Sequence, residues 1–80
     1  MAEEIGQRIQ KDIGKFDVSL DKIRGAKLDG KEREVVELAK MYASDAQSWL
    51  SKGDTYTSFS SIAYAHGLMD SILKLKGIIE

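Results

Sequence analysis

The residue best suited to acid–base chemistry is His66, the one histidine of the chain. Asp70 follows it by four residues, which on a helix is close enough for a hydrogen bond between the imidazole and the carboxylate. This pair has the chemistry of an oriented general base, or of a metal site completed by Asp45. We expect the structural alternative, a buried His66 that bonds Asp70 or a tyrosine of another helix, because apolar residues surround it at helical spacing.

A nucleophile to work with His66 is harder to find. Serines are frequent between residues 55 and 76, but a serine on the same helix as His66 cannot readily point at the imidazole as a catalytic triad requires. The chain has no cysteine, which removes thiolate nucleophiles, disulfides and thiolate metal sites. We therefore expect a protein that is not an enzyme, with no catalytic residue, no metal and no cofactor.

Helices have to position these residues. Apolar side chains recur at steps of three and four, which predicts helices near residues 2–24, 30–52 and 55–76. Gly6 and Gly14 lie inside the first helix, where each glycine costs about 1 kcal/mol relative to alanine. The first helix is therefore expected to be the least stable of the three.

Start and stop signals agree with these boundaries. Asp29 and Glu32 have the spacing of a capping box, Gly53 is suited to end the second helix, and Asp54 is suited to cap the third. Short connections predict an all-α fold, an antiparallel three-helix bundle with up-down-up topology, as one domain over residues 1–80. The side chains expected to be largely buried are Phe16, Leu20, Val35, Tyr42, Trp49, Phe59, Ile62, Met69 and Leu73.

The second half of the chain carries a family resemblance. Its distinctive residues are Asp45-Ala46, Trp49-Leu50, Lys52-Gly53-Asp54, Thr57, Phe59, Ile62 and the run Tyr64-Ala65-His66-Gly67-Leu68-Met69-Asp70. This pattern resembles the archaeal family catalogued as domain of unknown function 357, small helical proteins without an assigned activity. The resemblance implies an archaeal, cytoplasmic origin and a hairpin of the second and third helices. It carries over no catalytic residues.

The third predicted helix has an unusual distribution of charge. No formally charged residue occurs from Thr55 to Met69, and Tyr64, Leu68 and Leu75 fall on the side opposite the main apolar stripe. A helix that is apolar on both sides is usually covered on both sides. We expect self-association, as a homodimer, or docking of a partner helix on this strip; the competing arrangement is coverage by the first helix.

Basic residues gather at one end of the predicted bundle. The end of the first helix, the start of the second and the end of the third lie together in this topology. The candidate anion contacts at that end are Lys27, Lys31, Arg33, Lys74 and Lys76. We favour compensation of the helix dipoles and solvation as the explanation of these charges. The alternative is a small-ligand, nucleotide or anion-binding site.

Composition limits the remaining functions. The net charge is −1, with 12 basic and 13 acidic residues, which makes nucleic-acid binding unlikely. No stretch approaches the roughly 20 apolar residues of a membrane span, and the acidic start lacks the apolar run of a signal peptide. We expect a cytoplasmic protein with no membrane contact.

Overall fold

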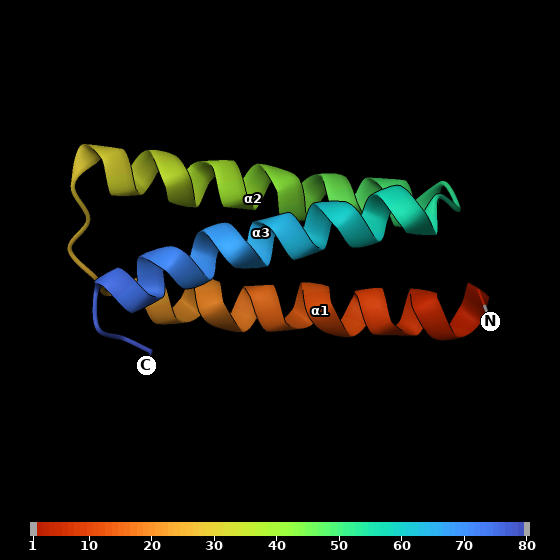
Figure 1. The fold of residues 1–80 in the computed structure, drawn as a ribbon, viewed down its shortest axis with the longest axis horizontal. Helices are drawn as coiled ribbons and strands as arrows, with labels where there is room; N and C mark the ends of the chain where they lie inside the picture. Colours follow the sequence, from red (N-terminus) through yellow and green to blue (C-terminus); the bar gives the residue numbers. More distant parts are fainter. Residues whose placement is uncertain (1, 80) are drawn as a thin grey trace.

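The computed structural model describes the backbone of residues 2–79 and the side chains of residues 4–79. It contains three helices, α1 (Ala2–Ile23), α2 (Gly30–Ser51) and α3 (Thr55–Leu75), and no strand over the described range. The chain runs along α1, back along α2 and forward again along α3 (Figure 1). The predicted all-α, up-down-up bundle is confirmed, and the predicted helix ends lie within one residue of the observed ones.

Local hydrogen bonds explain where the helices begin. The Asp29 carboxylate accepts from the Glu32 amide at 2.8 Å, and the Glu32 carboxylate accepts from the Asp29 amide at 2.9 Å. At the start of α3, Asp54 accepts from both the amide and the hydroxyl of Thr57, at 3.0 and 2.7 Å. These bonds satisfy helix amides that have no partner within the first turn.

Glycine ends α2. Gly53 has φ +85°, in the left-handed region that residues with a Cβ atom rarely adopt. Its amide donates to the carbonyl oxygen of Leu50 at 3.0 Å, and the amide of Asp54 donates to that of Trp49 at 3.0 Å. The chain therefore turns sharply enough for α3 to return along α2.

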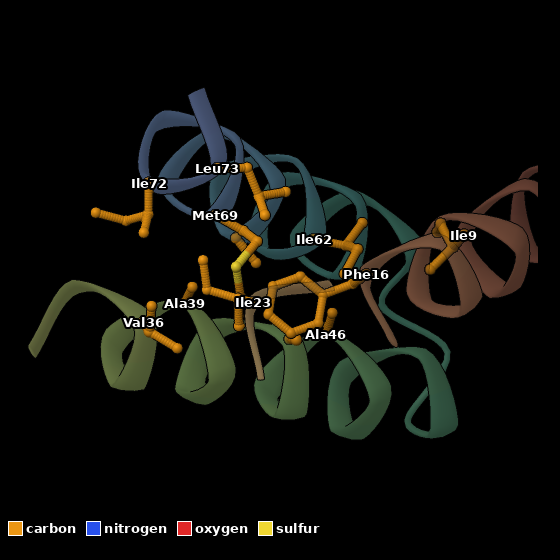
Figure 2. Packing of buried hydrophobic residues seen from close by; sticks show 12 residues of the cluster. Ile9, Phe16, Ile23, Val36, Ala39, Ala46, Ile62, Met69, Ile72 and Leu73 are labelled. Carbon is orange, nitrogen blue, oxygen red and sulfur yellow. The ribbon is translucent and has the colours of Figure 1, made fainter. Parts of the chain in front are cut away.

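The core lies where the three helices face one another (Figure 2). α3 packs most closely on α2, and α1 packs more closely on α3 than on α2. α2 contributes small residues to this contact, which lets the two backbones approach. The buried apolar residues are Ile9, Phe16, Ile23, Val36, Ala39, Ala43, Ala46, Ile62, Ala65, Met69, Ile72 and Leu73.

Two aromatic residues are not where the sequence placed them. Of the side chains predicted to be largely buried, Phe16, Ile62, Met69 and Leu73 are buried. Leu20, Val35 and Tyr42 are half-buried. Trp49 and Phe59, however, are exposed by 38% and 44%, so the prediction that they are buried is wrong.

The reason lies in the position beside Phe59. Ser58 is fully buried and donates its hydroxyl to the carbonyl oxygen of Ala46 at 2.6 Å. Because Ser58 and Ala46 are both small, α2 and α3 approach closely here, and Phe59 and Trp49 are rotated to the edges of the contact. Hydrophobicity alone does not reveal that a serine occupies this core position.

None of the helices, over the residues described, has the length and apolarity needed to cross a membrane.

Candidate functional site

His66 joins two helices. Its Nε2 lies 2.6 Å from the main-chain oxygen of Asp12 in α1, and because a carbonyl oxygen only accepts, Nε2 is the donor. The edge of the ring also packs against Phe16, with ring centroids 6.0 Å apart and an interplanar angle of 82°. The half-buried imidazole thus contacts the backbone of one helix and an aromatic side chain of the core.

The hydrogen-bond partner differs from the predicted one. Asp70 is exposed and makes no hydrogen bond with His66 among the described residues, and no tyrosine takes its place. The cause is the helical rotation: His66 lies on the side of α3 that faces α1, and Asp70 lies further round toward solvent. The described part of the chain also holds no group of three metal-ligating side chains, so Asp45 does not complete a metal site with this pair.

A second feature is an apolar surface shared by α2 and α3 on the side away from α1, which we call the outer face. The rings of Tyr42 and Tyr64 meet edge to face, with centroids 4.6 Å apart. The antiparallel register set by this contact places Leu38 opposite Leu68. The residues of the outer face are Leu38, Tyr42, Trp49, Tyr64, Leu68 and Leu75.

The three strip residues of α3 therefore lie on its flank beside α2 rather than at its back. Tyr64 and Leu75 are exposed by 51% and 75%, and Leu68 is half-buried against the core. α1 packs on the other flank, where His66 meets Asp12. The arrangement in which the first helix covers this strip is not the one observed.

The five basic residues do not converge on one site. Lys27 and Lys76 line a shallow cavity of about 500 Å³, where Lys76 also forms an ion pair with Glu32 at 2.7 Å. Arg33 lines a different cavity, and Ala26 of the α1–α2 connection lines both. Lys31 and Lys74 are exposed and line neither of these cavities.

A groove between α1 and α2 is a feature that the sequence did not reveal. It consists of two adjoining cavities of about 290 and 330 Å³, both lined by Leu20 and Lys40. Arg24 and Arg33 line the end nearest the α1–α2 connection. The spacing of Arg33 and Lys40, two helical turns apart, was the available signal, because residues at this spacing share a helix face.

A smaller cavity of about 300 Å³ lies where α1 begins and α3 begins. Ile5, Tyr56 and Phe59 line it, together with Thr55. The aromatic side chains near the α2–α3 turn are thus divided between two surfaces, since Tyr42 and Trp49 belong to the outer face.

A family model described as "Protein of unknown function (DUF357)" matches residues 11–78. The chain belongs to the DUF357 family. The match covers α2, α3 and the second half of α1, so the outer face and the α1–α2 groove of this DUF357 protein both fall inside it. No curated protein is similar to the chain at a significant level. The resemblance seen in the sequence is thereby confirmed for the family; the archaeal origin stays a prediction.

Proposed function

We propose that this DUF357 protein is a protein-interaction module that self-associates through the outer face of α2 and α3. The observation that carries the proposal is that α3, uncharged from Thr55 to Met69, exposes Tyr64 and Leu75. Leu68 of α3 and Tyr42 of α2, both half-buried, lie beside them. Single exposed apolar residues are ordinary on a protein surface, but a contiguous group of this kind is typical of an interface.

The size of the outer face supports a second copy as the occupant. A helix of 22 residues such as α2 is about 33 Å long, and two helices packed side by side present a face of roughly 600 Å². Specific interfaces bury about 1,200–2,000 Å² in total, so two such faces, roughly 1,200 Å² together, reach the lower end of that range.

Charge favours an antiparallel arrangement of the two copies. Lys31, Leu38 and Asp45 are spaced by seven residues, so they follow one another along the outer side of α2. A two-fold axis near Leu38 brings Lys31 of one copy to Asp45 of the other, twice. A parallel arrangement instead brings like charges together, which costs free energy.

The experiment is sedimentation equilibrium of the wild-type chain and of charge variants at Lys31 and Asp45. We expect a monomer–dimer equilibrium that weakens several-fold in Lys31→Glu and recovers in the double variant Lys31→Glu, Asp45→Lys, because the exchange restores opposite charges across the axis. The matched control is Lys11→Glu, an exposed change on α1 with the same change of net charge.

Three outcomes would contradict the proposal. Wild-type protein that stays monomeric at high concentration has no second copy on this face. Equal weakening by the α1 control shows that net charge alone controls association. A dimer that Lys31→Glu leaves intact while a separate protein binds the outer face points to partner-helix docking, the other mode of interaction we expected from the sequence.

We also propose a cytoplasmic location and a role without catalysis. The lack of cysteine supports the location, since the cytoplasm keeps thiols reduced and its proteins rarely depend on disulfides. The contacts of His66 with Asp12 and Phe16 support a packing role for the residue with the most obvious chemistry.

A further inference from the structure

The groove between α1 and α2 has a different chemical character at each end. Arg24, Arg33 and Lys40 line the cavity of about 290 Å³ nearest the α1–α2 connection, together with Glu37, the ion-pair partner of Lys40. Beyond Leu20 and Lys40, the second cavity is lined mostly by apolar groups, among them Ile13 and Phe16. Because Leu20 and Lys40 line both cavities, a cavity rich in basic side chains lies beside a mostly apolar one.

We propose that this groove binds a small amphiphile, with its carboxylate or phosphate head at Arg24, Arg33 and Lys40 and its unbranched apolar chain along Ile13, Phe16 and Leu20. The site goes beyond self-association, since it lies on the side of α2 that faces α1 and leaves the outer face free. Its ligand class follows from the two ends of the groove.

The cationic end has donors available for an anion. The guanidinium of Arg33 makes one long contact, 3.4 Å to the main-chain oxygen of Leu28. Arg24 and Lys40 form ion pairs with Asp21 and Glu37, both at 2.9 Å. Arg24, Asp21 and Glu37 are largely exposed and Lys40 is exposed by 46%. Ion pairs at the surface contribute little to stability, so a bound anion replaces the carboxylates at small cost.

The three cations come from two segments. Arg24 follows the last turn of α1, and Arg33 and Lys40 lie two turns apart on one side of α2. Side chains that approach from two helices surround a head group, which a row of cations along one helix does not. The buried side chains of Ile23 and Val36 form the floor between them.

At the apolar end, two of the α2 residues that line the cavity are small, between the longer Lys40 and Gln47. Ala43 and Ser44 line it opposite Phe16. In Figure 1, α3 crosses in front of the gap between α1 and α2, and the residues that line the second cavity all belong to α1 or α2. Asp17, at this end, repels an anion and so sets the direction in which the amphiphile lies.

The test is a titration of isotope-labelled full chain followed by amide chemical shifts. The probes are decanoate, decyl phosphate, 1-decanol and inorganic phosphate. The two anionic amphiphiles are kept below their critical micelle concentrations and 1-decanol below its solubility limit. We expect decanoate or decyl phosphate to shift amides near Arg24, Arg33 and Phe16, with an affinity about tenfold or more above that of 1-decanol and of inorganic phosphate. The stronger of the two anionic probes identifies the head group.

Two variants locate the site. Arg33→Gln is expected to weaken decanoate binding about threefold or more, whereas Lys52→Gln, the same change of charge at the far end of α2, leaves it unchanged. Ser44→Phe fills the apolar end from an exposed position and is expected to weaken decanoate while leaving the weak response to inorganic phosphate intact. Circular dichroism of each variant checks that the helices are retained.

Several results would overturn the proposal. One is no response to either anionic amphiphile. Another is equal affinity for 1-decanol, which means that the cations recognise nothing. Chemical-shift changes centred on Leu38 and Tyr64 would mean that the amphiphile binds to the outer face instead. Binding that Arg33→Gln and Ser44→Phe both leave unchanged would place the ligand outside the groove.

Discussion

The imidazole Nε2 of His66 donates a hydrogen bond to the main-chain oxygen of Asp12 at 2.6 Å and so joins α3 to α1. α1 has no close backbone approach to α2 comparable to the α2–α3 contact, so its position depends on α3. The residue with the most obvious acid–base chemistry thus makes a packing contact between the two helices.

Replacement of His66 separates this role from a chemical one. His66→Gln keeps an amide donor and is expected to lower the free energy of unfolding by about 1 kcal/mol or less, whereas His66→Leu loses the bond and is expected to cost about 1–3 kcal/mol. Urea unfolding measures both. Equal stability of the two variants and the wild type would show that the hydrogen bond contributes nothing.

The buried hydroxyl of Ser58 gives a second prediction. Ser58→Ala removes the hydrogen bond to Ala46 and is expected to lower the free energy of unfolding by about 1 kcal/mol, since the carbonyl oxygen remains part of helix α2 and is not left without a partner. Ser60→Ala, on the exposed side of the same turn, is the control and should leave stability unchanged. A stabilised Ser58→Ala would contradict this reasoning.

Glycines in α1 and at the end of α2 should respond in opposite directions to alanine. Gly14 is exposed within α1, and a Cβ added there meets no atom within 4 Å, so Gly14→Ala is expected to raise the free energy of unfolding by up to about 1 kcal/mol. Gly53 has φ +85°, so Gly53→Ala is expected to lower it by a similar amount. Thermal unfolding followed by circular dichroism distinguishes the two signs.

Asp54 makes stability depend on pH. The hydrogen bonds from the amide and hydroxyl of Thr57 hold the pKa of this carboxyl below its ordinary value of 3.8. A depressed folded-state pKa contributes stability above the unfolded-state pKa, and this contribution is lost as the pH falls through the folded-state value. As the pH falls below 3.8, the free energy of unfolding should therefore decrease less steeply in Asp54→Asn than in the wild type. Chemical unfolding at a series of pH values measures this slope. Identical slopes would show that the cap is not coupled to folding.

A substitution at Leu68, within the outer face, tests whether this surface is the site of self-association. Leu68→Lys places a charge on the half-buried side chain opposite Leu38 and should abolish self-association, while the fold tolerates the long lysine because its ammonium reaches solvent. Val18→Lys, at an exposed apolar position of α1, is the control and should leave association intact. Leu75→Lys, at a more exposed position, gives the answer if Leu68→Lys fails to fold. Dimers that persist in both outer-face variants would exclude this surface.

Local rules were enough to find the helices. The capping bonds of Asp29 and Asp54 and the positive φ of Gly53 depend on residues within a few positions of each other, so the sequence contains all that sets them. The spacing of apolar residues likewise identified Phe16, Ile62, Met69 and Leu73 as core. Helix ends and the main apolar stripe are short-range properties, and they were predicted correctly.

Local sequence patterns do not determine which residues of one helix contact another helix. Nothing local says that Ser58 rather than Phe59 enters the core, because the outcome depends on how closely α3 approaches the alanines of α2. The same distance decides that Tyr64 meets Tyr42 and that Leu38 lies opposite Leu68.

The sequence by itself determined that this is a helical DUF357 chain and where each helix begins and ends, because those features arise from neighbouring residues. The tertiary structure decided that His66 bonds Asp12 rather than Asp70, and that Arg33 and Lys40 share a groove with Arg24. Rotation of each helix about its axis sets these contacts. That rotation is fixed only when all three helices pack together, since burial is a property of the whole assembly of side chains.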